Sequence, residues 1–555
     1  MFRNSNILKI IDYIKGGLVL KLNKVLFLIT TIVLLLLVAC NNDDFKDNKQ
    51  TSEEALENLN KSGMPIVNEE VTLDIFAGKA PANSDNWNDI MIWDHYSDMT
   101  NINVNWELVP HTSLGEKRNL ALASGTLPDV FYGAGLTNLD LLKYGEQGIF
   151  IPLNDLIDNY APNLKTILDD NPDIRKAITF PDGNIYSLPN IRSPQFLSML
   201  VGARPWINQE WLNELGMDIP ESTEEFYQYL KKVKEEDPNG NGKADEIPYG
   251  GNVIDPLIGW LKGSFGLGNQ GKHLFDMDPN EDKLRFIPVA DEYKEMLEYV
   301  HKLYSENLIE QNIFSIDYNQ YLSNASEELY GSTVFYDPEE VFGIGESYEG
   351  ALALVGPDGE QAYVDVDHPV YTMGNLSITS ENENPEATIR WLDYFYGDEG
   401  AKLFYMGVEG ETYKENSDGS VEYLEKITNS AEGLTFEQEL SKYLIWIGTA
   451  APGIVKQEYF RGSETTEASI KAAEKLEPYI PEEIWPKFTY LKEENDTLSA
   501  LGTDIEKYVS EMRDKFITGD VPLTEWDNYV ETIENMGLEE YMSIQESAYE
   551  RYQSN

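Results

Sequence analysis

Polar and apolar residues alternate at residues 71–76, with the sequence VTLDIF, and this period of two predicts a β-strand. A helical pattern follows over residues 87–99, and a second strand pattern covers residues 102–109. The same order then repeats, with a helix over residues 117–124 and a strand that begins at Pro128. Strands that alternate with helices at this spacing predict an α/β fold with crossover connections.

Two helix starts can be located from their capping residues. Residues 222–225, with the sequence STEE, form a capping box, in which the first hydroxyl and the last carboxylate accept free backbone amides. Asn384 followed by Pro385 predicts an amide cap with proline at the first helical position. The chain from about Leu491 onward is predicted to be largely helical.

Length and composition set the scale of the fold. A chain of 555 residues exceeds what one hydrophobic core supports, so we expect two or more lobes. The apolar content of 41% and aromatic content of 12% are ample for packed cores. The formal net charge is 42 − 97 = −55, which disfavours nucleic acid, anionic membranes and large polyanions as partners.

The N-terminal segment has the pattern of a bacterial lipoprotein signal. Lys21 and Lys24 precede a 15-residue apolar run, Val25–Ala39, which is too short for a comfortable membrane span. The run ends in the sequence LVAC, which is similar to a lipobox. We therefore predict a signal peptide over residues 1–39 and acylation of Cys40 by two fatty-acid chains, such as palmitate, which together anchor stably. The alternative is a buried core cysteine after a short anchor helix.

The residues after the cysteine are polar and lack periodicity, so residues 40–70 are predicted to be a flexible tether. Because Cys40 is the single cysteine, no internal disulfide is expected. Translation that starts at Leu20 would give a more conventional signal sequence, and we retain this as a hypothesis.

The sequence DPNGNGKADE, at residues 237–246, has an oxygen-bearing side chain at nearly every second position. Counted from the first residue, these occupy positions 1, 3, 5 and 9: Asp237, Asn239, Asn241 and Asp245. Gly242 at position 6 permits a sharp turn, and Lys243 at position 7 offers only its backbone carbonyl. This matches the first half of an EF-hand loop, and hard oxygen ligands favour calcium over zinc.

The loop departs from the EF-hand at position 12, where Pro248 replaces the expected bidentate glutamate. Glu246 is the candidate that completes the ligand set. The competing interpretation is a hydrophilic turn without a metal, because Asn-Gly pairs form turns on their own.

Several segments share a resemblance to one family. The segment WINQEWLNELG, at residues 206–216, leads through the capping-box helix to the DPNGNGKADE loop. With LALASGTLPDV, GEQGIFIPLNDL and PDGNIYSLP, at residues 120–130, 145–156 and 181–189, it resembles extracellular solute-binding protein family 1. The segments WLDYFYG, GVEGE and FITG agree. The resemblance runs from about residue 71 to the C-terminus, and it is greatest to the branch of ABC-importer lipoproteins that includes alginate-oligosaccharide binders.

The resemblance implies an α/β, two-lobe fold like that of periplasmic binding proteins, of class II type, with a hinge and an interlobe cleft. The N-terminal lobe would comprise residues 71–190 and 370–445, and the C-terminal lobe residues 191–369 and 446–555. It also implies a structural calcium ion without the EF-hand glutamate. Its ligands would be the side chains of Asp237, Asn239, Asn241, Asp245 and Glu246 and the carbonyl of Lys243.

The implied function is capture of an oligosaccharide in the cleft and delivery to the transmembrane subunits of an ABC permease. The protein would be a monomer that is lipid-anchored at the outer face of the cell membrane, and it would not be an enzyme. Sugar sites combine aromatic faces with hydrogen-bonding side chains. We select the following candidates: Tyr132, Arg192, Arg204, Trp206, Trp260, Tyr371, Glu409 and Trp446. Core packing for the aromatic residues and salt bridges for the polar ones are the competing roles.

Two other functions stay open. A glycoside hydrolase needs two carboxylates across a scissile bond, and 97 acidic residues do not exclude such a pair. However, the sequence has no GxSxG motif, no HExxH motif and no glycine-rich phosphate loop. The third possibility is a lipoprotein that binds peptides or feeds a sensor kinase.

Overall fold

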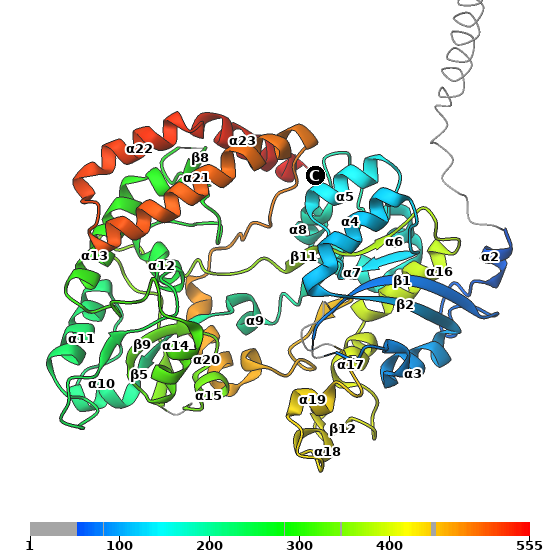
Figure 1. Cartoon of the computed structure of the whole chain (residues 1–555), viewed down its shortest axis with the longest axis horizontal. Coiled ribbons are helices and arrows are strands. Elements are labelled where there is room, and N and C mark those ends of the chain that lie inside the picture. Colours follow the sequence, from blue (N-terminus) through cyan, green and yellow to red (C-terminus); the bar gives the residue numbers. More distant parts are fainter. Residues whose placement is uncertain (1–52, 82, 282, 345–346, 446–450, 555) are drawn as a thin grey trace, which may run out of the picture. The chain divides into compact units, whose positions relative to one another are not determined.

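The computed structural model describes residues 53–554, except positions 82, 282, 345–346 and 446–450 (Figure 1). The predicted signal peptide and Cys40 lie outside the described residues, as does Trp446. Within the described residues the fold is mixed α/β and has two lobes, each with its own sheet. No helix in these stretches is both long enough and apolar enough to cross a membrane.

The N-terminal lobe contains a six-stranded sheet in the order β14-β4-β11-β3-β1-β2. Strand β1 pairs in parallel with β2 and β3, whereas β11 is antiparallel to β3 and β4. Strand β14 returns to the sheet parallel to β4. The strands are β1 (Val71–Lys79), β2 (Ile102–Pro110), β3 (Val130–Tyr132), β4 (Leu188–Arg192), β11 (Val370–Ile378) and β14 (Ile454–Val455).

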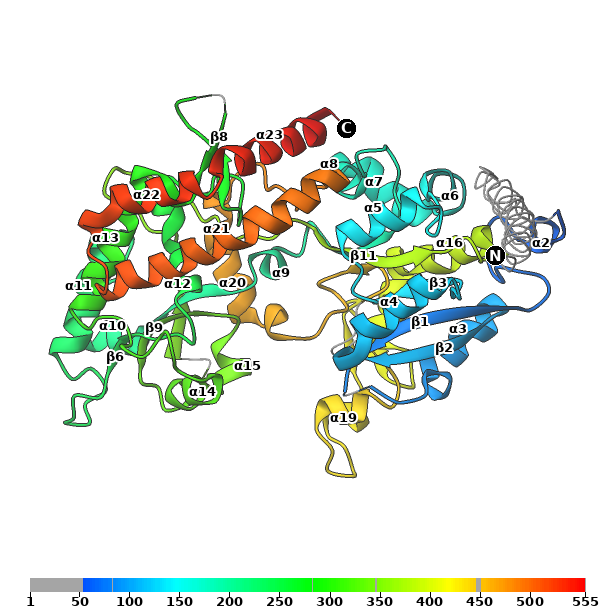
Figure 2. The same cartoon turned by 45° about the horizontal axis from the view of Figure 1, so that its top comes forward.

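Helices surround this sheet (Figures 1 and 2): α5 and α8 contact β11, whereas α3 contacts β2 and packs on α16. The helices are α2 (Glu53–Asn58), α3 (Met91–Thr100), α4 (Leu114–Ser124), α5 (Asn138–Glu146), α6 (Asn154–Tyr160), α7 (Pro162–Asp170), α8 (Pro172–Ile178), α16 (Pro385–Asp393), α17 (Asp398–Met406), α18 (Glu425–Thr428) and α19 (Phe436–Leu440). Short 3₁₀ turns are η1 (Trp87–Asp89), η2 (His111–Ser113) and η6 (Tyr394–Tyr396), and a hairpin joins β12 (Tyr413–Glu415) to β13 (Val421–Tyr423).

The C-terminal lobe contains a four-stranded sheet in the order β10-β5-β9-β6 and a separate hairpin of β7 and β8. Its strands are β5 (Arg204–Asn208), β6 (Ile247–Tyr249), β7 (Phe275–Met277), β8 (Leu284–Phe286), β9 (Tyr330–Phe335) and β10 (Tyr348–Gly350). Its helices are α9 (Leu197–Val201), α10 (Gln209–Leu215), α11 (Thr223–Glu235), α12 (Asp255–Lys262), α13 (Asp291–Ser305), α14 (Tyr318–Ser326), α15 (Pro338–Phe342) and α20 (Glu467–Leu476). The 3₁₀ turns are η3 (Gly263–Phe265), η4 (Ile287–Val289), η7 (Ser463–Thr465) and η8 (Glu477–Tyr479).

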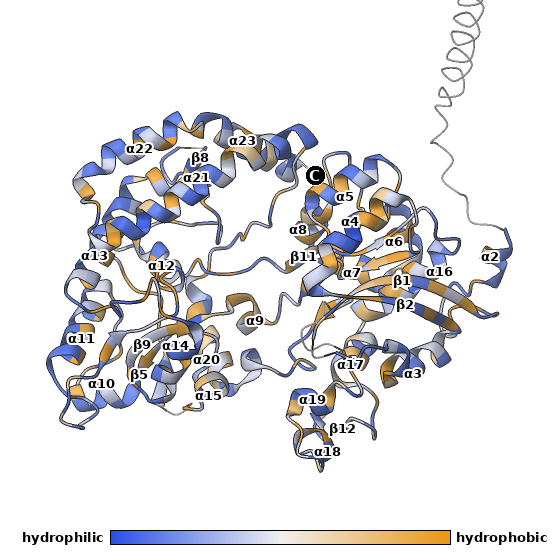
Figure 3. Cartoon of the chain, viewed as in Figure 1, coloured by the Kyte–Doolittle hydropathy of each residue, from blue (hydrophilic) through white to orange (hydrophobic). Residues whose placement is uncertain are grey.

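The chain ends in three helices: α21 (Lys492–Thr518), α22 (Trp526–Asn535) and α23 (Leu538–Ser554), with η9 (Leu523–Glu525) between the first two. Helices α22 and α23 follow one another end to end and run back along α21 (Figures 1 and 2). These helices mix hydrophilic and hydrophobic residues along their length (Figure 3), as expected for helices with one buried face. The apolar residues Trp526, Tyr529 and Ile533 of α22 are buried. The helical pattern predicted for this tail is therefore confirmed.

Two hydrophobic cores correspond to the two sheets. One joins buried residues from segments 59–199 and 373–459, and the other joins residues from segments 200–366 and 473–541. Aromatic residues dominate part of the first core, where Trp93 stacks on Trp391 with ring centroids 5.7 Å apart. The lobe boundaries drawn from the resemblance stay a prediction.

Most of the predicted elements near the start of the fold are present, with one correction. The helix predicted over residues 87–99 is interrupted, because Ile90 is extended, with φ −87° and ψ 124°, and it separates η1 from α3. The Asn86 side chain caps η1 by accepting a hydrogen bond from the Asn88 amide. The cap thus fixes the start of η1, and the extended Ile90 ends it before α3 begins.

The two predicted caps differ from their expected forms. Ser222 accepts the Glu225 amide at 3.2 Å as expected, but the Glu225 carboxylate accepts the amide of Glu221 rather than that of Ser222. Before α16, the Asn384 side chain makes no capping bond. Its backbone amide instead donates to Asn382 at 2.8 Å, so a turn positions the start of this helix.

Part of the segment predicted to be a tether is folded. Residues 53–58 form α2, and Ile66 and Val67 are buried against the N-terminal core. Arg390 on α16 donates to the carbonyl of Gly63 at 2.9 Å. Buried apolar residues and hydrogen bonds to α16 and to Thr100 together hold this otherwise polar segment against the lobe.

Candidate functional site

Three chain segments lead from the N-terminal sheet toward the C-terminal lobe, and they lie side by side. Residues 193–203 follow β4, residues 363–369 precede β11, and residues 456–466 follow β14. The Ser193 amide donates to Val455 at 2.9 Å, which joins the first and third segments. The Arg192 amide donates to Pro369, also at 2.9 Å, which joins the first and second.

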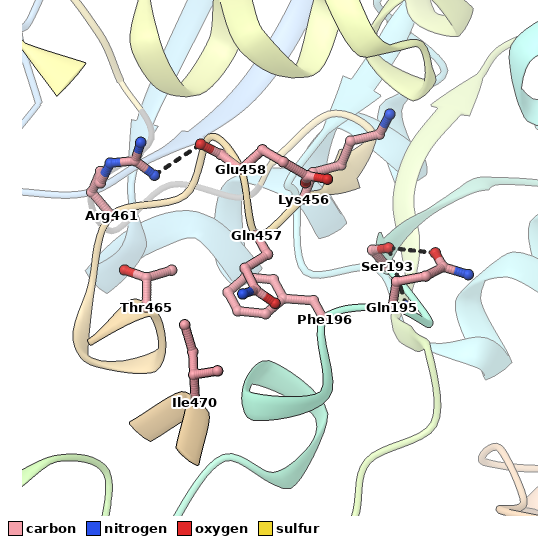
Figure 4. Close-up of a pocket in the computed structure, with 9 residues that line it drawn as sticks. All are labelled: Ser193, Gln195, Phe196, Lys456, Gln457, Glu458, Arg461, Thr465 and Ile470. Atoms are coloured by element: carbon pink, nitrogen blue, oxygen red, sulfur yellow. Dashed lines mark hydrogen bonds between the residues drawn. The ribbon is translucent and has the colours of Figure 1, made fainter. Parts of the chain in front are cut away.

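A cavity of about 560 Å³ lies at these segments, and we call it the hinge cavity (Figure 4). It is lined by Ser193, Gln195, Phe196, Lys456, Gln457, Glu458, Arg461, Thr465 and Ile470. The first three residues follow β4, the next four follow β14, and the last two belong to η7 and α20. The lining thus comes from segments more than 250 residues apart in sequence.

Internal contacts hold several of these side chains in place. The Ser193 hydroxyl donates to the Gln195 side-chain oxygen at 2.9 Å. The Arg461 guanidinium donates to the carbonyls of Glu458 at 2.9 Å and of Val421 at 2.5 Å, and burial lowers its pKa. Lys456 pairs with Asp398 at 3.0 Å. Arg461 is therefore occupied by backbone acceptors, whereas the Gln457 side chain makes no hydrogen bond to any residue that the structure describes.

The cavity wall suits a neutral, hydroxyl-rich ligand. Gln195 and Gln457 supply amides that both donate and accept hydrogen bonds. Phe196 is fully buried and packs edge-on against Phe460, with ring centroids 6.0 Å apart, so it shapes the wall from behind. Glu458 is the one carboxylate in the described lining, whereas hydrolysis by two carboxylates needs a second one.

A charged network crosses the same segments. Asp367 accepts from Arg192 at 2.6 Å and lies 3.0 Å from Lys272 of the C-terminal lobe. The Arg192 guanidinium also lies over the ring of Tyr371, 3.8 Å from its centroid. Tyr371 is 58% exposed, so this ring keeps a large accessible surface. Arg192 and Tyr371, both predicted from the sequence, are thus in direct contact.

Four other residues predicted to bind the sugar are buried. Arg204 and Trp206 are at most 1% exposed, and Trp260 and Tyr132 at most 2%. Arg204 donates to the carbonyls of Ser198 and Tyr336 and to the Ser469 hydroxyl. The indole N–H groups of Trp206 and Trp260 donate to backbone carbonyls at 3.1 and 2.9 Å. The Arg204 Nε is buried without a partner. Burial together with these hydrogen bonds to the backbone nevertheless favours a structural role for Arg204, Trp206 and Trp260 in this conformation.

Glu409 is the last of the predicted sugar-binding residues that the structure describes. It is exposed in the turn after α17 and does not line the hinge cavity. The sequence-based selection missed Gln195 and Gln457, because isolated glutamines carry no recognisable signal.

The oxygen-rich loop at residues 237–246 lies between α11 and β6. The Asp237 carboxylate accepts the amides of Asn241 at 3.1 Å and of Gly242 at 2.8 Å. The Asp245 carboxylate accepts the side-chain amides of Asn239 and Asn241, and these hydrogen bonds lower its pKa. Gly242 has φ +77°, the left-handed conformation that the sharp turn requires. The predicted ligands therefore converge.

Glu246 supplies the test of whether this loop suits a cation. One of its carboxylate oxygens is buried without a hydrogen-bond partner. Burial raises the pKa of Glu246, and the neighbouring carboxylates of Asp237 and Asp245 raise it further. Clustered carboxylates with an unpartnered buried oxygen fit a bound cation. Within the described chain no group of three or more His, Cys, Asp or Glu side chains is placed to hold a metal ion.

The sequence of this chain is similar to those of known solute-binding proteins. A family model of bacterial extracellular solute-binding proteins matches residues 85–402. The chain is 30% identical over 502 residues to the fructooligosaccharide ABC transporter substrate-binding protein FusA of Streptococcus pneumoniae, covering 88% of this chain and 92% of that protein. It is 24% identical to a polygalacturonan/rhamnogalacturonan-binding protein of Bacillus subtilis, covering 81% of this chain and 86% of that protein.

Solved structures agree with the two-lobe fold. FusA of S. pneumoniae in complex with kestose has a TM-score of 0.69 and 29% identity, covering 87% of this chain and all of that chain. A solute-binding protein of Bifidobacterium longum subsp. infantis has a TM-score of 0.74 at 21% identity, covering 87% and 98% of the respective chains. The fold class predicted from the sequence is confirmed.

Proposed function

Because the chain belongs to the bacterial extracellular solute-binding proteins, we propose that it is the substrate-binding component of an ABC importer and captures a short, neutral oligosaccharide at the hinge cavity. The observation that supports this proposal is the hinge cavity itself. Its wall contains the side-chain amides of Gln195, from the segment after β4, and of Gln457, from the segment after β14. The 30% identical relative is named for fructooligosaccharide transport, which makes fructose-containing oligosaccharides the first candidates.

Capture by closure follows from the position of the cavity. The lining comes from the segments after β4 and β14 and from α20. A ligand contacts all of them at once only in the closed form of the protein, so its binding shifts the population toward that form. Arg192 and Tyr371 offer an exposed aromatic face beside the same crossovers. The sugar is bound and released without any bond being broken, and the closed form is delivered to the permease subunits.

Isothermal titration calorimetry of purified protein with kestose and nystose tests the proposal. Oligogalacturonides serve as the acidic comparison, and a mixture of short peptides serves as the comparison from another ligand class. We expect saturable 1:1 binding of a neutral oligosaccharide and none of peptides. Binding of peptides alone would favour the sensor or peptide function, and release of smaller sugars from a labelled oligosaccharide would favour a hydrolase.

A bound calcium ion at residues 237–246 is the second part of the proposal. Its ligands are the side chains of Asp237, Asn239, Asn241, Asp245 and Glu246 and the carbonyl of Lys243. The buried, unpartnered oxygen of Glu246 supports it, and so does a FusA structure, at 29% identity, that is described as an EF-hand mutant. Calcium would neutralise this carboxylate cluster and fix the connection between α11 and β6, which is a structural role.

Lipid anchoring completes the proposal. The apolar run that ends in LVAC indicates cleavage before Cys40 and acylation of its thiol, which would hold the protein at the outer face of the membrane. Mass spectrometry of the N-terminal peptide from the native host is the test. A diacylated Cys40 is the expected result, and an unmodified chain that retains residues 1–39 would contradict it.

A further inference from the structure

A second cavity, of about 290 Å³, lies within the C-terminal lobe, where α12 and α21 meet the segment that leads to β11. Its described lining does not overlap with that of the hinge cavity. Lys262 ends α12, Lys272 precedes β7 and Arg513 lies on α21, so three cationic side chains reach this cavity from different elements. The carboxylates of Asp255 and Asp365 and the exposed Glu506 also line it. We call it the α12–α21 cavity.

Two of the three cations have carboxylate partners. Lys272 lies 3.3 Å from Asp365 and 3.0 Å from Asp367. Arg513 donates to Asp255 at 2.7 Å and lies 2.9 Å from Asp514. These ion pairs leave little unneutralised charge on either side chain.

Lys262 differs from both. Within the described chain its ammonium group makes no hydrogen bond and has no carboxylate oxygen within 4.0 Å. Burial lowers the pKa of Lys262, and the more distant Asp365 and Asp276 oppose this effect. A cationic group that is largely removed from water and lacks a partner is costly, so an anion in the cavity would be stabilised there.

The other walls indicate which kind of anion fits. Ile258 on α12, Ile287 in η4 and Val509 on α21 line the same space. A small inorganic oxyanion would leave these apolar walls facing water, whereas an organic acid would cover them. We propose that the α12–α21 cavity binds a small organic monocarboxylate, with its carboxylate on Lys262 and its hydrocarbon part against Ile258, Ile287 and Val509.

Monocarboxylates of increasing apolar size test this assignment, because they chelate calcium weakly and leave the loop at residues 237–246 undisturbed. Acetate, butyrate and benzoate are titrated by calorimetry into purified protein at constant calcium and pH, with inorganic phosphate and sulfate as comparisons. We expect 1:1 saturable binding of butyrate or benzoate that is tighter than that of acetate. Absence of saturable carboxylate binding, or equal binding of phosphate or sulfate, would overturn the proposal.

Variants locate the binding. Lys262→Met keeps the aliphatic stem and should weaken carboxylate binding by about 10- to 100-fold, as expected for the loss of a charged hydrogen bond. Lys117→Met, at an exposed position on α4, is the matched control and should bind as the unmodified protein does. Unchanged binding by Lys262→Met would place the ligand elsewhere and overturn the assignment.

A second variant guards against misfolding of the first. Ser510 is an exposed residue on α21 at the rim of the cavity, so Ser510→Phe should obstruct the cavity while Lys262 is retained. It should lose carboxylate binding with an unchanged circular dichroism spectrum, and retained binding would contradict the site. Neither readout uses an oligosaccharide, so this test and that of the proposed function can fail independently.

Discussion

The loop at residues 237–246 and the hinge cavity are built in opposite ways. The loop draws all of its candidate ligands from ten consecutive residues, and local hydrogen bonds among them hold it together. The hinge cavity is lined by residues 193–196 and residues 456–470, which only the tertiary fold brings together. A contiguous site can be seen in the sequence, whereas an assembled site is recognised from the sequence only by residue type.

This difference decides how far spacing in the sequence can place a site. Asp237, Asn239, Asn241 and Asp245, which were selected by spacing, lie close enough to form hydrogen bonds within the loop, and calcium binding by them stays a prediction. For the assembled site, residue type suggested Trp206 and many other aromatic or basic residues, although the same types also form cores. Arg204 is such a residue: it was selected by type as a sugar ligand, and it is buried in the structure. We expect the largest effect on the free energy of unfolding when this residue is replaced.

Arg204→Met should lower the free energy of unfolding by about 3–5 kcal/mol, because it leaves its buried backbone acceptors without a donor. Urea denaturation of the variant and the unmodified protein measures this difference. If Arg204 instead contacts the sugar, oligosaccharide affinity would fall while stability hardly changes. Lys471→Met, at an exposed lysine on α20, is the control and should stay within about 0.5 kcal/mol of the unmodified protein.

The next largest effect is the removal of calcium. A ligand that binds only the folded state at 100 times its Kd stabilises that state by about 2.7 kcal/mol. Excess chelator should therefore lower the Tm, and added calcium, but not magnesium at equal concentration, should restore it. Asp237→Ala should abolish the response to chelator, whereas Asp278→Ala, in the β7–β8 hairpin, should retain it. A Tm that chelator does not change would identify the loop as a metal-free turn.

The fold could be predicted further than the sites. The alternation at β1 and β2 and the apolar stripe of α22 record which face each element buries, and that information is local. The extended Ile90 and the folded residues 53–70 were missed, because one backbone conformation and contacts with residues distant in sequence decide them. Gln195 and Gln457 are functional candidates only through their neighbours, which a single sequence does not record.

A smaller effect is expected in the assembled site. Gln457→Ala should weaken oligosaccharide binding by about 2- to 10-fold, the loss of one neutral hydrogen bond, and should leave the calcium response unchanged. Gln438→Ala, at the capping position of α19, is the matched control for the sugar titration. If both variants bind with unchanged affinity, the ligand does not contact Gln457. If the Tm of Gln457→Ala no longer responded to calcium removal, the loop and the hinge cavity would not be independent sites.

The smallest effect concerns pH and the loop. Burial and the nearby carboxylates raise the pKa of Glu246 in the metal-free protein, so the folded state holds this proton more tightly than the unfolded state. The contribution of Glu246 to stability is therefore present at low pH and is lost as pH rises above the ordinary glutamate value. With calcium the direction reverses, because the ion requires the carboxylate in its ionised form.

Glu246→Gln separates these two slopes. Without metal, the stability of the variant relative to the unmodified protein should increase from pH 4 to pH 7, because the amide never pays the cost of ionisation in this cluster. In saturating calcium the same comparison should reverse at pH 7, since the variant lacks a charged ligand. Chemical denaturation at both pH values, with and without calcium, measures all four differences. Equal slopes in the two metal states would show that Glu246 is not a calcium ligand.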